Sequence, residues 1–184
     1  MTKGEFLRSN REAGFRQVYE VNYDRVLAYS LRRAEPQDAQ DAVAETWLVA
    51  WRRFDDVPDD PLPWLFGVCR KALSNKRRTH SRRVALQDRI AGGAILTQRD
   101  HADAVGERNR IESALRSLRE PDREALLLIA WEGLKPAEAA AALNCSTRTF
   151  AVRLHRAKAR LAKELALGEP SETLPTRVAV EEAP

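Results

Sequence analysis

The feature that most constrains this chain is the spacing of its apolar residues, which recur every three or four positions along most of its length. In PWLFGVCRKALSNKRRTHSRR, residues 63–83, the apolar positions are Leu65, Val68, Cys69, Ala72 and Leu73. This i, i+3, i+4, i+7, i+8 spacing places the side chains on one face of an α-helix. The sequence contains no strand-like alternation of period two, so we predict an all-α fold.

Breaker residues and periodicity predict the individual helices. In the first half of the chain we expect helices over 6–19, 24–33, 38–54 and from Pro63 onward. The stretch 55–62, rich in Asp and Pro, cannot sustain a helix and is expected to be a loop. In the second half we expect helices over 108–118, 121–131, 136–143 and 147–165.

The same patterns divide the chain into parts. Periodicity weakens after about residue 83, where Gly92, Gly93 and mixed polar residues favour a flexible linker. The final segment is rich in Pro, Thr and Glu and is expected to be disordered. We therefore predict a helical domain over 1–83, a linker over 84–106, a second helical domain over 107–167 and a tail over 168–184.

Charge is distributed unevenly around a formal net charge of +4. Acidic residues dominate 38–60, and the helix that begins near Pro63 carries a dense cationic run on the side opposite its apolar stripe. A second basic run lies within 148–163. Such asymmetry indicates different partners for different surfaces, with anionic partners for the two basic runs.

Several classes of protein are disfavoured. Cys69 and Cys145 lie far apart, and the three histidines are scattered, so we predict no disulfide framework, no metal site and no cofactor. The sequence has no Gly-rich phosphate loop and no nucleophile–base arrangement, which argues against an enzyme. It has no long apolar run and no signal peptide, so we expect a cytoplasmic protein that does not insert into membranes.

The stretch LKPAEAAAALNCSTRTFAVRLHRAKARL has the pattern of a helix-turn-helix. Pro136 opens a short alanine-rich helix, 144–146 form a turn, and Ser146 or Thr147 can cap the next helix. That helix buries Phe150 and Leu154 and turns a basic face outward, as a recognition helix in a DNA major groove does. The plainer alternative is a surface helix of a small bundle with a solvated basic face.

The order and spacing of these motifs resemble those of extracytoplasmic-function (ECF) sigma factors, minimal members of the bacterial sigma-70 family. DAQDAVAETWLVAWRRF is similar to their polymerase-binding helix, and PWLFGVCRKALSNKRR to the helix after their promoter-contacting loop. ESALRSLREPDREALLL through RLHRAKARL looks like their fourth domain. The resemblance covers about 13–165 and implies two small helical domains, sigma domain 2 and a helix-turn-helix sigma domain 4, joined by a flexible linker.

The resemblance implies roles for the first domain. The helix over 38–54 would bind the clamp helices of core RNA polymerase through Asp38, Asp41, Glu45, Trp47 and Trp51. The alternatives are a solvated, helix-dipole-compensating face for the carboxylates and core packing for the tryptophans. The loop 55–62 would capture an unstacked base of the minus-10 element. The strand beside it would be held by Arg70, Lys71, Asn75, Arg77 and Arg78.

The resemblance likewise implies that the second domain recognises the minus-35 element. The expected contacts come from the second helix of the helix-turn-helix: Arg148, Thr149, Val152, Arg153, His155, Arg156 and Arg160. Arginines can bond guanine in bidentate fashion, and Val152 can contact thymine methyl groups. Arg153 and Arg160 are expected on phosphates, on the premise that no acid lies nearby. Lys135 stands where a capping Ser or Thr is common, at a cost of roughly 1 kcal/mol.

The predicted function is therefore that of an ECF RNA polymerase sigma factor. It would bind core polymerase, recognise promoter DNA and promote transcription initiation, near the nucleoid when in holoenzyme. Many family members are held inactive by an anti-sigma factor, which is a further candidate partner. Two alternatives stay open from the sequence: a stand-alone regulator that uses only the helix-turn-helix, and a helical interaction protein that binds no DNA.

Overall fold

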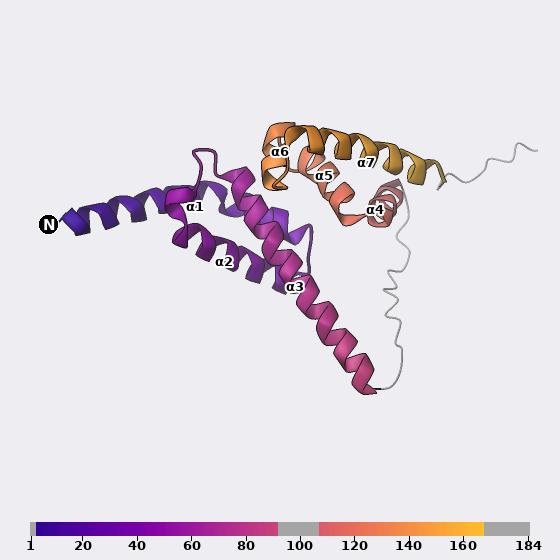
Figure 1. Ribbon diagram of the computed structural model, residues 1–184, viewed down its shortest axis with the longest axis horizontal. Coiled ribbons are helices and arrows are strands. Elements are labelled where there is room, and N and C mark those ends of the chain that lie inside the picture. Colours follow the sequence, from indigo (N-terminus) through magenta and orange to yellow (C-terminus); the bar gives the residue numbers. More distant parts are fainter. Residues whose placement is uncertain (1–2, 92–106, 168–184) are drawn as a thin grey trace, which may run out of the picture.

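The computed structural model describes residues 3–91 and 107–167, which form seven α-helices and one 3-10 helix and no strand (Figure 1). The all-α prediction is confirmed. The elements are α1 Lys3–Leu31, α2 Pro36–Arg52, η1 Phe54–Asp56, α3 Leu62–Ala91, α4 Glu107–Ser117, α5 Glu120–Ala130, α6 Pro136–Ala142 and α7 Thr147–Leu167.

The first helix differs from the prediction of two helices, because α1 continues without a break through residues 20–23. That segment contains no Gly or Pro. The one residue in it that favours turns, Asn22, is buried, and its Nδ2 donates to the Val18 carbonyl oxygen one turn earlier, at 2.8 Å. An amide bonded back within the helix stabilises the helical backbone instead of competing with it.

The core of the first three helices forms around the apolar stripe of α3. Leu65, Cys69, Ala72 and Leu73 are all buried, and Val68 is half-buried. The stripe is therefore the packing face that the periodicity predicts. Beside it, the rings of Tyr29 and Phe66 stack with centroids 4.5 Å apart. Burial of this stripe fixes which side of α3 remains for its charged residues.

The end of α3 reaches beyond the expected first domain. The helix continues to Ala91 and projects away from the other helices (Figure 1), into the segment 84–106 that we expected to be a linker. Its last residues, VALQDRIA, contain no Gly or Pro, so nothing in them ends a helix. The rest of the expected linker, 92–106, and the expected tail, 168–184, lie outside the described residues.

The helix-turn-helix is formed by α6 and α7. Asn144 adopts a positive φ of 51°, a conformation that Asn tolerates better than most residues, and turns the chain between the helices. Ser146, one of the two expected caps, accepts the Thr149 backbone N–H at 3.1 Å. Phe150 and Ala157 then bury one side of α7 against the domain core. The cap and the buried side together set which face of α7 is exposed.

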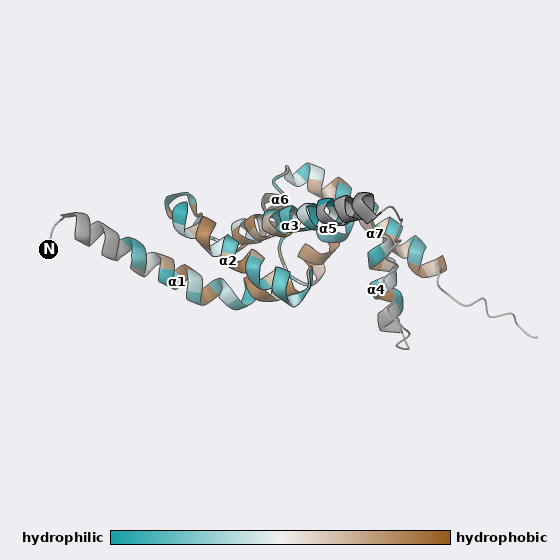
Figure 2. Cartoon of the chain, turned by 90° about the horizontal axis from the view of Figure 1, so that it is seen from below, coloured by the Kyte–Doolittle hydropathy of each residue, from teal (hydrophilic) through white to brown (hydrophobic). Residues whose placement is uncertain are grey.

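Hydropathy varies along each helix instead of separating whole helices by type. Figure 2 shows hydrophobic and hydrophilic residues interspersed along the elements. No helix in the described part of the chain is long and apolar enough to cross a membrane.

Candidate nucleic-acid interface

The outward face of α7 carries most of the residues expected to contact the minus-35 element. Arg148, Thr149, Val152, His155 and Arg156 are exposed, and Arg153 is half-buried. Within 107–167, Arg148 and Arg156 have no ion-pair partner in the described structure. Unpaired cations around an exposed apolar side chain can meet phosphates and base edges together.

A hollow of about 510 Å³ lies beside this face and adds an arginine that the sequence reasoning missed. Its walls include Arg148, Arg153 and Arg156 of α7 together with Arg119, the residue that precedes α5. Arg119 is exposed and stands at the positive end of α5, where backbone N–H groups point outward. The sequence signal was its place immediately before the helix-opening pair Glu120-Pro121. We treated 119–120 as a helix boundary only.

The premise that no acid lies near Arg160 is wrong. Nη1 of Arg160 is bonded to Oδ2 of Asp122, a buried residue in the first turn of α5. Asp122 is 38 positions away in sequence, so only the fold brings the two together. Arg160 is therefore held against α5, while Arg153 has no ion pair in the described structure.

The residues of α3 expected at the minus-10 element fall on two sides of the helix. Lys71, Asn75 and Arg78 are exposed and share one side, at i, i+4 and i+7. Arg70 and Arg77 are turned about 100° from them and line a hollow of about 650 Å³ between α3 and the helices α4 and α5. The α3 residues expected at the minus-10 element therefore lie on two different sides of the helix.

The loop expected to capture a base is open to solvent. Asp55, Asp56, Asp59 and Asp60 are exposed, and η1 forms its first turn. Arg53 Nε lies 3.0 Å from Asp56 Oδ2, so one of the carboxylates is engaged locally. The loop ends where Leu62 enters the core at the start of α3.

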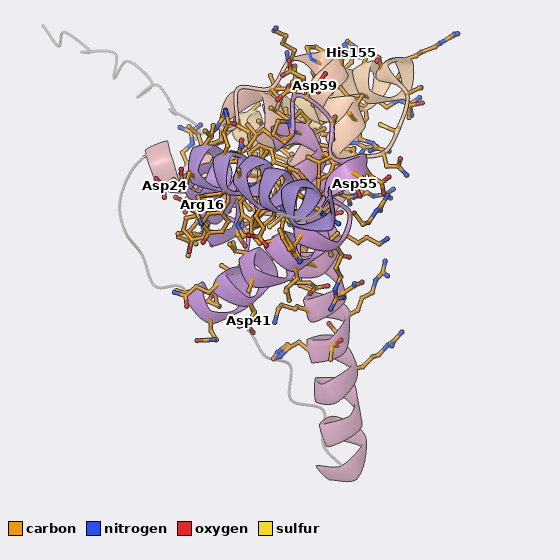
Figure 3. All side chains as sticks on the ribbon, turned by 90° about the vertical axis from the view of Figure 1, so that its left-hand side faces the viewer. Arg16, Asp24, Asp41, Asp55, Asp59 and His155 are labelled. Atoms are coloured by element: carbon orange, nitrogen blue, oxygen red, sulfur yellow. The ribbon has the colours of Figure 1, made fainter. Side chains whose placement is uncertain are left out.

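The exposed side of α2 combines acids with an apolar residue. Asp38, Asp41 and Glu45 are all exposed, and Asp41 projects at the edge of the body opposite His155 (Figure 3). Leu48 continues the same side three positions after Glu45 and is 55% exposed. It was missed, although its helical phase places it opposite the buried residues of α2. A single exposed leucine is common on protein surfaces, so Leu48 extends this face without marking it as an interface by itself.

Burial separates the two tryptophans expected on that helix. Trp47 is 7% exposed and packs edge-on against Phe15, with ring centroids 6.1 Å apart. Trp51 is 39% exposed and packs against the same phenylalanine at 5.1 Å. Core packing therefore accounts for Trp47, and Trp51 is the aromatic residue that reaches the surface.

The surroundings of Asp41 and Cys69 shift the pKa values of these two groups in opposite directions. A hydrogen bond and charge from Lys76, whose Nζ lies 2.8 Å from Asp41 Oδ2, lower the pKa of Asp41. Burial raises the pKa of the Cys69 thiol, which keeps it protonated and poorly nucleophilic. Both cysteines are free. No group of three or more His, Cys, Asp or Glu among the described residues is placed to hold a metal ion.

Two family models match the chain. Residues 18–83 match "Sigma-70 region 2", and residues 108–161 match "Sigma-70, region 4". The first match contains α2 and the basic part of α3, and the second contains the helix-turn-helix. Both surfaces described above therefore fall within the matched segments.

Individual relatives agree with these matches. The chain is 29% identical over 149 residues to RNA polymerase sigma factor NccH of Alcaligenes xylosoxydans xylosoxydans, which covers 76% of this chain and 80% of that protein. It is 31% identical over 136 residues to RNA polymerase sigma factor CnrH of Cupriavidus metallidurans, with 67% and 71% covered. Among solved structures, sigma factor RpoE of Bartonella quintana, in complex with anti-sigma factor NepR, superposes with a TM-score of 0.63 at 26% identity, covering 85% of this chain and 99% of that chain.

Proposed function

Since the chain belongs to the ECF group of the sigma-70 family and is an RNA polymerase sigma factor, we propose that its three exposed surfaces have separate roles in transcription initiation. The exposed side of α2 binds core polymerase, α3 binds the minus-10 element, and α7 binds the minus-35 element. The match of residues 18–83 to region 2 favours this function over a stand-alone helix-turn-helix regulator.

The observation that carries the proposal is the open basic face of α7 and the hollow beside it. Arg148 and Arg156 stand exposed on either side of Val152, and Arg119 extends the cationic surface to the start of α5. Arg148 and Arg156 supply base or phosphate contacts, and Val152 supplies an apolar contact for a thymine methyl. Arg119 adds a phosphate contact, and Arg160 is positioned through Asp122.

For polymerase binding we assign Asp38, Asp41, Glu45 and Trp51, and add Leu48. The acids provide charge complementarity, which steers association, and Leu48 with Trp51 provides apolar area at the centre of the contact. Trp47 supports this face from the core. For the minus-10 element, Lys71, Asn75 and Arg78 form the exposed contact, and Arg70 and Arg77 extend it.

The chain acts, in this proposal, without catalysing a reaction and in the cytoplasm, as part of holoenzyme at the nucleoid. An anti-sigma factor is a proposed partner. Its support is that the solved relative RpoE of Bartonella quintana is described in complex with the anti-sigma factor NepR, and that CnrH is described in complex with the cytosolic domain of CnrY.

The test separates the surfaces by substitution. Arg156→Ala should weaken binding of holoenzyme to promoter duplex and leave polymerase binding unchanged. Asp41→Ala with Glu45→Ala should weaken polymerase binding and should not reduce the DNA affinity of the free chain, because the loss of Asp41 also frees Lys76 of α3. Lys163→Ala and Glu20→Ala are matched controls, because they remove exposed charges from α7 and α1 outside the proposed surfaces. Equal loss of both functions in both variants would contradict the division.

A further inference from the structure

The loop over 55–62, which we expect to capture an unstacked base, is fixed to the first domain only at its two ends. At its far end Leu62 is buried at the start of α3. At its near end η1 closes one turn, in which the Val57 N–H donates to the Phe54 carbonyl oxygen at 3.1 Å. In the described part of the chain, no side-chain hydrogen bond or ion pair involves residues 58–60, which are exposed. The place of the loop therefore depends on what supports its two ends.

The near end of the loop rests on α1 through the ring of Phe54. This ring packs edge-on against Phe15, with ring centroids 5.9 Å apart. It also lies directly over Gly14, where an added Cβ would be 3.2 Å from Phe54 Cζ and 3.3 Å from Cε1. Both distances are shorter than an ordinary van der Waals contact. Glycine thus lets the ring approach the helix backbone, and a larger residue at position 14 would displace Phe54 and with it the start of the loop.

Arg11, one turn earlier on α1, supports the same end of the loop. Its Nη2 donates to the Trp51 carbonyl oxygen at 2.9 Å, in the last turn of α2, where carbonyl groups lack partners within the helix. A cation is favoured at this negative end of a helix. Its Nη1 lies 3.9 Å from Oδ2 of Asp55, and its guanidinium lies 5.4 Å from the centroid of the Trp51 ring. Arg11 thus joins α1 both to the end of α2 and to the first residue of the loop.

These contacts belong to one packed face of α1. Its residues recur at i, i+3, i+4 and i+7 and are all half-buried: Arg11, Gly14, Phe15 and Val18. The residues between them are exposed, and Arg16 lies on the side of α1 opposite Asp55 (Figure 3). The match to "Sigma-70 region 2" begins only at residue 18. Residues ahead of the matched segment therefore support a loop that lies within it.

The capture of a base makes the position of such a loop important. Taking a base out of the stack costs free energy, which the contacts in the receiving pocket must offset. Contacts of this kind act only when they are held within about 0.5 Å of the productive geometry. A loop anchored at both ends meets this requirement. Release of its near end would let it move, although every residue that touches DNA would still be present.

We propose that Arg11 and Gly14 are positioning residues for promoter opening, which hold the near end of the loop 55–62 where it receives the extruded base. Neither residue contacts DNA in this proposal, and both act through Phe54 and Asp55. The proposal rests on the proposed role of the first domain at the minus-10 element. It gives α1 a part in transcription initiation, although α1 belongs to none of the three proposed surfaces.

The experiment disturbs this support in two independent ways. Gly14→Val places a side chain against Phe54, and Arg11→Gln removes the guanidinium, with Arg11→Lys as its conservative variant. Gln17→Val and Arg16→Gln are matched controls, because both residues are exposed on the same helix. Each full-length variant is combined with core RNA polymerase on a promoter fragment taken from a start site of the natural holoenzyme. The fragment carries 2-aminopurine, which fluoresces when unstacked, in place of single adenines of the minus-10 element. Titration gives the affinity for the fragment, and stopped-flow fluorescence gives the rate of unstacking.

We expect Gly14→Val and Arg11→Gln to unstack the base about tenfold more slowly, since a contact misplaced by 1 Å can cost about 10²-fold. Polymerase affinity, fragment affinity and unfolding temperature should match those of the controls, and Arg11→Lys should recover part of the rate. Valine is no worse than glycine inside a helix, so a loss of rate in Gly14→Val would not reflect a weaker helix.

Two results would overturn the positioning role. One is an unchanged unstacking rate in both variants. The other is a loss of rate that only follows a loss of affinity and of unfolding temperature, as a purely structural role predicts. Arg11→Gln adds no bulk, so it keeps the test decisive if Gly14→Val does not fold. A natural holoenzyme that starts nowhere, or that unstacks no base, would instead refute the proposed function and this proposal with it.

Discussion

The basic faces of α3 and α7 carry similar residues but have different surroundings. On α3, Lys76 is paired with Asp41 of α2 and Arg77 with Glu120 of α5. On α7, Arg148 and Arg156 project into solvent without an ion-pair partner in the described structure. The cations of α3 are thus shared with acids of other helices, while on α7 Arg160 is held by Asp122 and Arg148 and Arg156 are exposed.

The difference shows that a run of cations in a sequence indicates possible DNA contacts. The residues packed against that run in the fold determine which of its cations are free to make them. In the described part of the chain, the acids paired with α3 belong to other helices, Asp41 to α2 and Glu120 to α5, and Asp41 lies 35 positions from Lys76. The face of α7 is exposed because α6 and the domain core cover only its apolar side. We therefore expect Arg148 and Arg156 of α7 to be fully available to DNA, and the paired cations of α3, Lys76 and Arg77, to contribute less than their charges suggest.

The largest effect should come from Arg33→Ala, which breaks the buried ion pairs of Arg33 with Glu124 and Glu132 without touching either basic face. Removing one partner from a buried ion cluster costs about 3–5 kcal/mol. We expect the two domains to lose their coupling and to unfold in two transitions instead of one when urea unfolding is followed by circular dichroism. Arg32→Ala, which removes a more exposed arginine paired with Glu132 only, should have a smaller effect. A single unchanged transition in Arg33→Ala would refute this coupling.

The next largest effect should come from the double variant Arg148→Ala, Arg156→Ala. Holoenzyme that carries it should lose about 1–3 kcal/mol of promoter-binding free energy for each side chain. If both arginines contact phosphates, the slope of log affinity against log salt should fall by about 2. Titrations between 50 and 200 mM salt measure both quantities.

Arg77→Ala is the comparison for that variant. Arg77 is already shared with Glu120, so its removal should weaken DNA binding less than the removal of an unpaired arginine. We expect less than a threefold change in affinity, on the scale of a partly exposed ion pair. A loss from Arg77→Ala as large as that from the α7 double variant would show that the two faces are equally available.

A smaller effect should appear at alkaline pH. Burial, reinforced by the nearby Glu124 carboxylate, holds the pKa of Tyr29 well above its ordinary value of 10.0. A raised pKa in the folded state contributes stability below the unfolded value and loses it as pH rises past about 10. Unfolding free energies measured from pH 8 to 11 should therefore fall less steeply in Tyr29→Phe. Parallel curves would exclude Tyr29 as the source, leaving Cys69, whose raised pKa acts in the same direction from about pH 9.

The last prediction concerns the stability of the second domain alone. The Lys135 backbone N–H donates to Glu138 Oε2 at 2.8 Å, which supplies one half of a capping box at the start of α6. Lys135→Ser would add the other half and should stabilise the domain by about 1 kcal/mol without altering either basic face. Thermal unfolding measures the gain, and DNA affinity should not change.

Much of the fold could be predicted because helical periodicity is local. The apolar stripe of α3 and the positions of α6 and α7 follow from spacing and from Pro136 and Ser146. The predicted break in α1 was wrong because the Asn22 side chain, which favours turns, bonds within the helix. Whether an asparagine side chain bonds within a helix or favours a turn depends on its rotamer and its burial, and the residue type alone gives neither.

The candidate site could be predicted less completely, because its missing parts are long-range. Leu48 could have been found from its helical phase, and Arg119 from its place before α5. The pairing of Asp122 with Arg160 could not be read from the sequence, and neither could the burial of Arg33 between two glutamates 91 and 99 positions away. These contacts depend on how the helices pack, and no local pattern records them.

The most direct measurement is to mix the purified chain with core RNA polymerase, isolate the complex on a sizing column and map where it begins transcription. We predict a stable complex that starts at discrete sites and protects DNA at both the minus-10 and minus-35 elements, with the second protection lost in the Arg148→Ala, Arg156→Ala variant. The absence of a complex, together with sequence-selective duplex binding by the chain alone, would contradict its action as a two-domain sigma factor.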